Sequence, residues 1–330
     1  MCDTPVAVSS RTIAPPTSPL APATRTLVSG VRVNTVVFAM TYRLCGVGRN
    51  NPLESRVESR IWGVRRVRTA RPRILVVLPT LGDRLALLER ALRSVEAQRE
   101  SADVSLVMVV PSGKKEARAL GKKFGATLVD DPGAGMSAAM NAGLDARRDE
   151  EFYIWLGDDD YYLPGGLSVL ASLLTSNPKA VVAYGGCHYV DDSGEVLWTS
   201  RAGALAKLIV GFGPNLIPHP AALMRIDAVE AVGGYDESLR YAMDLDLFLS
   251  LRTQGEFVST TEAVSAFGWQ PASLTVSDRN ASAEEARRIK RHHLPNWLLP
   301  VEPLWEYPVA WVSAYAAHRI SKKATLGNNG

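Results

Sequence analysis

The sequence has 330 residues, 46% of them apolar, which is enough for one large domain or two small ones with a substantial core. A formal net charge of +3, without clusters of Lys and Arg among aromatic side chains, argues against a nucleic-acid-binding protein. The cysteines Cys2, Cys45 and Cys187 are widely spaced and form no Cys-x-x-Cys, which argues against a disulfide framework or a zinc site and suits a reducing cytoplasm.

Residues 1–70 are predicted to form a disordered or weakly structured leader. Residues 1–30 are rich in Pro, Ser, Thr and Ala and lack the charged start and long apolar core of a signal peptide. The apolar run Thr35–Met40 is too short to span a bilayer. The arginines from Arg56 to Arg71 suit either an anionic membrane face or a solvated basic linker.

Residues 73–146 alternate between predicted strands and helices. Apolar runs at 74–78, 104–110 and 127–129 predict three strands, each followed by a turn that contains Pro and Gly. A helix is expected after each strand, and Asp83 is expected to cap the first turn of the first helix. This alternation predicts an α/β fold with a doubly wound sheet.

Three adjacent aspartates, Asp158, Asp159 and Asp160, follow a fourth apolar strand at 153–156. Ligands of open α/β sheets bind at this end of the strands. Carboxylates this close repel one another unless they are solvated or a divalent cation neutralises them. Oxygen ligands alone select Mg²⁺ or Mn²⁺. The alternative is a solvated acidic turn that caps a helix beginning near Pro164.

No glycine-rich phosphate-binding motif follows the first strand, in either the Gly-x-Gly-x-x-Gly or the Gly-x-x-x-x-Gly-Lys-Ser/Thr form. This absence argues against a dinucleotide-binding dehydrogenase and a P-loop ATPase. The phosphates of a bound nucleotide would therefore have to be held by a metal ion, which the aspartates can bind.

Five stretches resemble, in this order, the bacterial family-2 glycosyltransferases of the GT-A fold, in the branch that builds polysaccharides and cell-envelope glycans. The stretches are Pro79-Thr80, Gly135–Gly143, Gly157–Pro164, Gly233–Glu237 and Met243–Asp246. The resemblance covers about 73–280. It implies a Rossmann-like, mostly parallel central sheet flanked by helices, in a GT-A domain at 71–290 followed by an aromatic-rich tail at 291–330.

The resemblance also implies inverting transfer of a sugar from a nucleotide-sugar, UDP-sugar by default, to a hydroxyl of a glycan or lipid-linked acceptor. Mn²⁺ or Mg²⁺ would neutralise the departing diphosphate. Asp159 falls on the family's metal-binding aspartate, Asp158 near the ribose or the metal, and Asp160 near the metal shell or donor sugar. Gly157 stands where the family has the first Asp of Asp-x-Asp. Asp158 and Asp160 form another such pair, so the assignment of ligands within the triplet stays open.

Asp244 matches the family's catalytic base, which takes the proton of the attacking hydroxyl. The alternative is that Asp244 only stabilises the start of its helix. Asp246 should point to another side of that helix, because successive residues turn by about 100°. Met243 replaces the family's Glu before the base.

The resemblance places further residues in the donor pocket. Pro79, Thr80 and the segment from Gly135 to Asn141 are expected to form its walls, and Ser112 stands near the position of a base-binding Asp. His219, between two prolines, is expected either near the donor or acceptor or in a structural role.

The tail from residue 291 carries aromatic residues and a basic end, which suits a peripheral anchor on the inner face of the plasma membrane of a cytoplasmic enzyme. Packing on the catalytic domain or another subunit is the alternative. Two alternatives to the transferase remain: a sugar-phosphate nucleotidyltransferase and a non-catalytic nucleotide-sugar-binding protein.

Overall fold

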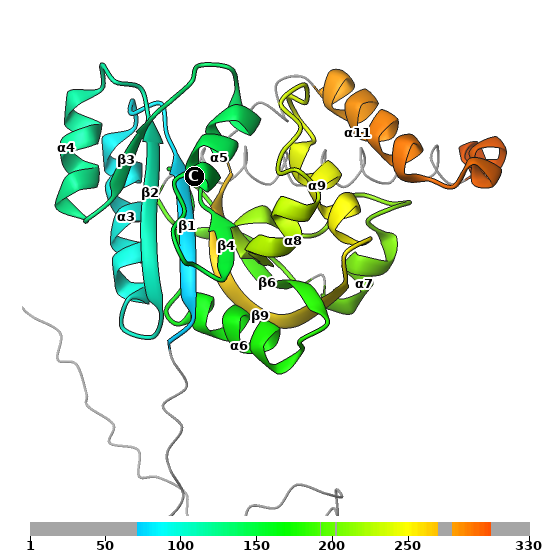
Figure 1. The fold of residues 1–330 in the computed structure, drawn as a ribbon, viewed down its shortest axis with the longest axis horizontal. Coiled ribbons are helices and arrows are strands. Elements are labelled where there is room, and N and C mark those ends of the chain that lie inside the picture. Colours follow the sequence, from blue (N-terminus) through cyan, green and yellow to red (C-terminus); the bar gives the residue numbers. More distant parts are fainter. Residues whose placement is uncertain (1–70, 192, 202, 270–278, 305–330) are drawn as a thin grey trace, which may run out of the picture. The chain divides into compact units, whose positions relative to one another are not determined.

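The computed structural model describes residues 71–191, 193–201, 203–269 and 279–304, all of which belong to the second of two units of the chain, Thr69–Gly330 (Figure 1). The predicted leader at 1–70 and the tail from 305 onward lie outside the described residues. Among the described residues, no helix combines the length and apolar character that crossing a membrane requires.

Nine strands of the described residues form one sheet, in the order β3-β2-β1-β4-β8-β6-β9-β5, with β7 paired to β6. The strands are β1 (Arg73–Pro79), β2 (Asp103–Val110), β3 (Thr127–Asp130), β4 (Phe152–Trp155), β5 (Tyr161–Tyr162), β6 (Ala180–Val190), β7 (Val196–Ser200), β8 (Ala222–Arg225) and β9 (Glu256–Gly268). Strands β1 to β4 are mutually parallel, and β6 runs parallel to β9. Strands β5, β7 and β8 pair antiparallel with their neighbours.

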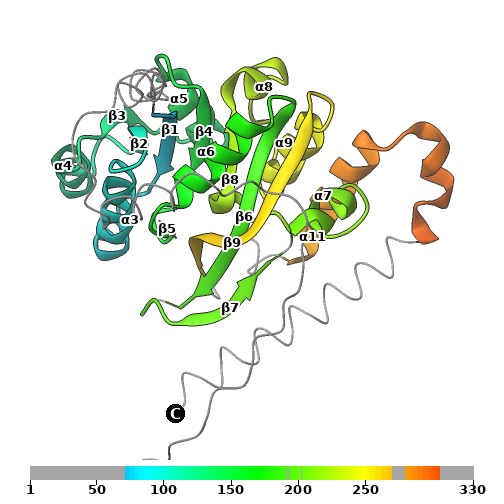
Figure 2. The same cartoon turned by 90° about the horizontal axis from the view of Figure 1, so that it is seen from below.

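Helices cover both faces of this sheet (Figures 1 and 2). They are α3 (Leu85–Gln98), α4 (Lys115–Lys123), α5 (Met136–Asp145), α6 (Gly166–Ser176), α7 (Gly203–Ile209), α8 (Ile226–Ala231), α9 (Met243–Leu251) and α11 (Arg279–His293), with 3-10 turns η1 (His219–Ala221) and η2 (Asn296–Val301). Alternate residues of β1 divide between two cores, because successive side chains of a strand point to opposite faces. Leu75 belongs to the core that contains residues of α5, α8 and α9, whereas Ile74 belongs to the core that contains residues of α3 and α6.

The predicted α/β alternation and the mostly parallel sheet are confirmed. The predicted cap of the first helix is wrong. Helix α3 begins after Arg84 and has no side-chain cap, and the carboxylate of Asp83 instead pairs with Lys114 on the loop before α4. An acidic residue before a helix can pair with a cationic side chain from another segment instead of capping the helix. The local sequence does not distinguish these two roles.

The carboxyl ends of β1, β2 and β4 meet at one edge of the sheet. Pro79 stands opposite Val109 of β2, and Val77 stands opposite Trp155 of β4. Loops that follow these strands therefore converge at the edge where ligands of open α/β sheets bind.

Candidate active site

Thr80 and Asp158 join the loops after β1 and β4. The Thr80 hydroxyl donates a 2.6 Å hydrogen bond to Oδ2 of Asp158, and both side chains are buried. The backbone N–H of Gly82 donates in turn to the Thr80 hydroxyl over 2.9 Å. One oxygen of the first aspartate is therefore held by the Thr80 hydroxyl from the loop after β1, and Gly82 orients that hydroxyl.

Arg84, at the start of α3, supplies a positive charge to the aspartate cluster. Its guanidinium pairs with Oδ1 of Asp158 and, over 2.9 Å, with Oδ2 of Asp159. A second arginine, Arg90, donates to the backbone oxygen of Asp159 over 2.8 Å. Burial and the neighbouring carboxylate of Asp160 raise the pKa of Asp159, and the charge of Arg84 opposes that rise.

Asp160 is the most deeply buried member of the triplet, with 1% of its surface exposed. Its Oδ1 accepts a 2.9 Å hydrogen bond from the backbone N–H of Gly268 at the end of β9. The Nε2 atom of His219 lies 3.5 Å from its Oδ2, and this buried nitrogen makes no hydrogen bond. The His219 ring is held flat on Trp155, with 3.8 Å between ring centroids and 6° between planes.

Two carboxylate oxygens converge over Gly157. A Cβ at Gly157 would lie 2.9 Å from Oδ1 of Asp159 and 2.9 Å from Oδ2 of Asp160. A side chain at this position would therefore have to displace the carboxylates of Asp159 and Asp160.

This donor set fits a hard divalent cation that also binds phosphate. Such a cation takes one or two carboxylates from the protein and fills its shell with phosphate oxygens and water. Within the described part of the chain, no group of three or more His, Cys, Asp and Glu side chains forms a complete metal site. Oδ1 of Asp159 and Oδ2 of Asp160 both lie beside Gly157, so these two carboxylates are the candidate ligands.

Asp244 stands in the first turn of α9, apart from the triplet. Its Oδ2 accepts a 3.1 Å hydrogen bond from the Asn215 side chain, and its Oδ1 accepts one from the backbone N–H of Leu245 over 2.8 Å. Burial raises the pKa of Asp244, and the charge of His219 acts against that rise. His219 therefore interacts electrostatically with Asp244 while its Nε2 atom lies beside Asp160.

Asp246 points elsewhere, as predicted. Its Oδ1 lies 2.8 Å from Nε2 of His293, on α11. The two aspartates of α9 therefore have different partners, and Asp244 is the one that shares an environment with His219.

The other predicted donor-pocket residues lie in different settings. Pro79 is buried at the end of β1, Ser112 is exposed after β2, and Gly135 precedes α5 with φ of 107°. Asn141 is already engaged, because its side chain bonds both the N–H and the C=O of Tyr235. These bonds tie α5 to the turn at 233–237, which gives Asn141 a structural task.

Sequence reasoning did not find Arg84, Arg90 and Asn215, each of which contacts an aspartate of the site. Arg84 lies close to the Pro-Thr turn in the sequence, which was the available signal. Asn215 comes from a loop 29 residues before Asp244, and nothing in the sequence pairs the two.

A row of aromatic rings begins beside the triplet. His219 meets Phe267 edge-on, and Tyr189 contacts the rings of Phe267, Trp198 and Trp269 at centroid distances of 5.4, 5.0 and 6.1 Å. Trp198 ends the row with 47% of its surface exposed.

Residues 75–233 match the family model described as Glycosyl transferase family 2. No curated protein matches the sequence. The match ends before α9, so Asp244 lies outside it.

Two solved structures share the fold. Residues 1–349 of TarS from S. aureus, in complex with UDP-GlcNAc, give a TM-score of 0.52 at 15% identity, over 66% of this chain and 65% of that one. The mannosyltransferase PcManGT from Pyrobaculum calidifontis, in complex with GDP-Man and Mn²⁺, gives 0.54 at 18% identity, over 84% and 87%. The chain thus spans just under two thirds of the TarS fragment, and the expected GT-A fold is confirmed.

Proposed function

We propose that this chain, a glycosyltransferase whose residues 75–233 form a family-2 domain, is a metal-dependent inverting enzyme. The observation that carries the proposal is the contrast between two sets of carboxylates. Asp158 and Asp159 are paired with the guanidinium of Arg84, whereas the side chain of Asp244 accepts a hydrogen bond from the neutral amide of Asn215. Titratable groups whose environments differ in this way take different roles in catalysis.

The aspartate triplet is the donor side of the proposed site. Asp159 and Asp160 would hold Mn²⁺ or Mg²⁺, which supplies positive charge to the diphosphate of a nucleotide-sugar as it leaves. Arg84, against Asp158 and Asp159, is placed to add a second positive charge there. PcManGT was solved with GDP-Man and Mn²⁺, and the TarS fragment was solved with UDP-GlcNAc. These complexes support a nucleotide-sugar donor for this chain, but they do not indicate whether its nucleobase is uracil or guanine.

Asp244 belongs to the acceptor side of the proposed site. Inversion requires a base on the face of the sugar opposite the leaving group, within reach of the attacking hydroxyl. A carboxylate whose pKa is raised by burial is a stronger base than an exposed one, and Asn215 fixes the orientation of Oδ2. The proton of the acceptor hydroxyl would pass to a carboxylate oxygen of Asp244.

The acceptor in this proposal is a glycan or a lipid-linked glycan of the cell envelope. The aromatic row that ends at Trp198 supports a sugar acceptor, because binding sites for small organic ligands are lined mainly by apolar and aromatic side chains. Tyr189, within this row, also interacts electrostatically with Asp160 and Asp244. The row therefore reaches two of the aspartates of the proposed site.

Incubation with UDP- and GDP-sugars and either Mn²⁺ or Mg²⁺ tests the proposal. Release of the nucleoside diphosphate that requires both the metal and Asp244 is expected, first with water as a slow acceptor and then with candidate glycans. Formation of a nucleotide-sugar and pyrophosphate from a nucleoside triphosphate and a sugar phosphate would instead identify a nucleotidyltransferase. Tight binding without turnover of any donor would identify a binding protein.

A further inference from the structure

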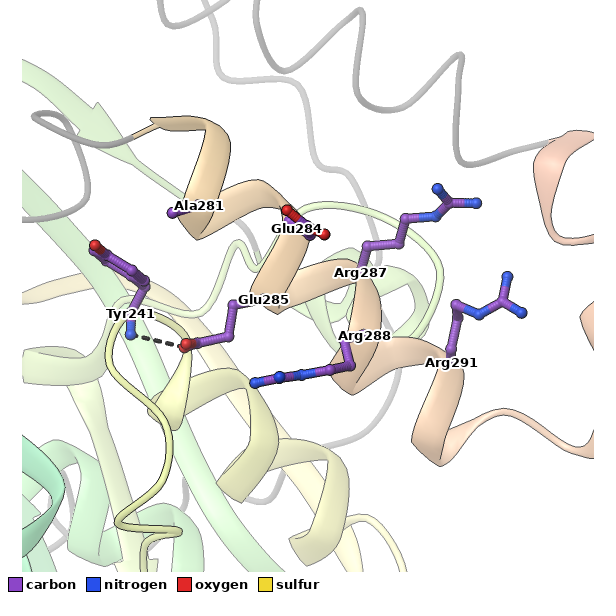
Figure 3. Close-up of a pocket in the computed structure, with 7 residues that line it drawn as sticks. All are labelled: Tyr241, Ala281, Glu284, Glu285, Arg287, Arg288 and Arg291. Atoms are coloured by element: carbon purple, nitrogen blue, oxygen red, sulfur yellow. Dashed lines mark hydrogen bonds between the residues drawn. The ribbon is translucent and has the colours of Figure 1, made fainter.

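The start of helix α9 is capped by a residue from another helix. Helix α9 begins after Ala242 and has no side-chain cap of its own. Glu285, on α11, accepts hydrogen bonds at Oε1 from the backbone N–H groups of Tyr241 over 2.7 Å and Ala242 over 2.9 Å. The N–H of Arg240 lies 3.2 Å from both carboxylate oxygens (Figure 3 shows the Tyr241 bond). One carboxylate therefore accepts from the N–H of the N-cap residue Ala242 and from the two N–H groups that precede it in the chain.

A second contact holds the two helices together further along. His293, at the end of α11, pairs with Asp246 of α9 over 2.8 Å, and Ile289 between the two contacts is buried in the same core as α9. Helix α11 thus holds the first turn of α9 on either side of Asp244.

Two arginines of α11 pair with a different carboxylate. Arg287 and Arg291 both pair with the buried carboxylate of Glu302 and point away from Tyr241 (Figure 3). Arg288 is exposed and lies with Glu285 beside a cavity of about 530 Å³ between α11 and the loop before α9. The cavity lining consists of Tyr241, Ala281, Glu284, Glu285, Arg287, Arg288 and Arg291, and none of these is a residue of the site described above.

We propose that Glu285 is a positioning residue for the reaction, which fixes Asp244 by capping the start of α9. The inference rests on the proposed role of Asp244 as base. Asp244 is two residues beyond Ala242, whose N–H is held by Glu285, so a shift of that turn moves the base directly. A misplacement of about 1 Å can reduce turnover by roughly 10²-fold.

The charge of Glu285 should also affect the base. The N-terminus of a helix carries a partial positive charge, which an anion at the cap offsets. Without that anion, the partial charge favours ionised Asp244 and lowers its pKa. The other groups that act on Asp244 are His219, Asn215, Tyr189 and Tyr235, and Asp246 is paired with His293.

Hydrogen exchange tests the contact itself in the full-length protein. In Glu285→Ala, the amides of 240–246 should exchange about 10-fold faster, because three donors lose their acceptor. Glu284→Ala is the matched control, since Glu284 is the exposed neighbour on the same helix. Unchanged exchange in Glu285→Ala would overturn the proposal.

Turnover of the nucleotide-sugar tests the consequence for the base. Glu285→Ala should lower kcat about 10- to 100-fold while the affinity for nucleoside diphosphate with Mn²⁺ stays within about 2-fold. Glu285→Gln keeps an acceptor oxygen without the charge, so it should recover most of kcat and move the acid limb of the pH–rate profile to lower pH. Two results would contradict the positioning role. One is a normal kcat in Glu285→Ala despite faster amide exchange, and the other is a kcat that is as low in Glu285→Gln as in Glu285→Ala.

The two proposals fail in different ways. If the wild type turns over no nucleotide-sugar, the proposed function is wrong and the positioning role falls with it, while hydrogen exchange still decides whether Glu285 caps α9. If the wild type is active and Asp244→Asn is inactive, normal turnover in Glu285→Ala would contradict the role of Glu285 but leave the proposed function standing.

Discussion

A guanidinium nitrogen of Arg84 lies 2.9 Å from Oδ2 of Asp159, so a cation of the protein itself pairs with a predicted metal ligand. The same side chain also pairs with Asp158. Arg84 is thus a competitor for any metal ion that arrives without a nucleotide, because both would neutralise the same carboxylates.

Replacing Arg84 should strengthen binding of Mn²⁺ alone. In Arg84→Ala, two carboxylates lose their counter-charge, and we expect affinity for Mn²⁺ without nucleotide to rise about 10-fold, as a change of about 1.4 kcal/mol gives. Electron paramagnetic resonance of free Mn²⁺ measures this. Arg93→Ala is the control, because Arg93 pairs with Glu89 on the exposed side of the same helix. Equal Mn²⁺ affinity in the wild type and both variants would show that Arg84 does not compete.

Asp159→Ala should abolish Mn²⁺-dependent binding of nucleoside diphosphate. The change removes one of two candidate ligands but also relieves repulsion within the triplet, so the fold should persist. Calorimetry with UDP and GDP, with and without Mn²⁺, measures the effect. Asp145→Ala, at an exposed aspartate that ends α5, should bind as the wild type does. Metal-dependent binding that survives in Asp159→Ala would assign the metal elsewhere.

Gly157→Ala should weaken the site and the fold together. Its new Cβ would stand 2.9 Å from oxygens of Asp159 and Asp160, and such overpacking typically costs about 1–3 kcal/mol. The melting temperature and the affinity for nucleotide in the presence of Mn²⁺ should both fall. Gly113→Ala is the control, because a Cβ there meets no atom within 4 Å. A fully stable Gly157→Ala that binds metal normally would show that the two carboxylates need not converge.

Asp244→Asn should lower turnover by about 10²–10⁴-fold with donor affinity unchanged, since an amide cannot accept the proton of the acceptor. The wild-type rate should fall at acid pH, with an apparent pKa above 3.8, because burial raises the pKa of the base. Kinetics across pH for wild type, Asp244→Asn and Asp246→Asn measure this. A larger loss in Asp246→Asn would move the base to that residue.

Asp244→Asn should also be more stable than the wild type at neutral pH. Folding raises the pKa of Asp244, so its charged form opposes folding once the pH exceeds that pKa. Wild-type stability should therefore lose a contribution as pH rises through the folded pKa, and Asp244→Asn should not. Equal stability of both proteins across this range would mean that the charge is not disfavoured by burial.

Strands and motifs were predictable, whereas contacts between distant segments were not. The apolar runs of β1 and β2 and the aspartates after β4 are local patterns, and the sheet brings their ends together as parallel topology requires. The cap that Glu285 provides and the hydrogen bond from Asn215 to Asp244 cross 43 and 29 residues of chain, and no local pattern encodes them. The misassigned role of Asp83 has the same cause, because its partner Lys114 comes from another loop.

Residues 75–233, which match the family model, precede in the chain the residue that caps α9. Residues 75–233 leave the ribosome before Glu285 and His293 exist, and domains generally begin to fold from their N-terminal side. A nascent chain that already has the aspartate triplet thus lacks Glu285, the residue that caps α9. Under the roles proposed above, a polypeptide that ends before α11 would carry the aspartate triplet and Asp244 but not Glu285, so it should bind donor better than it turns donor over.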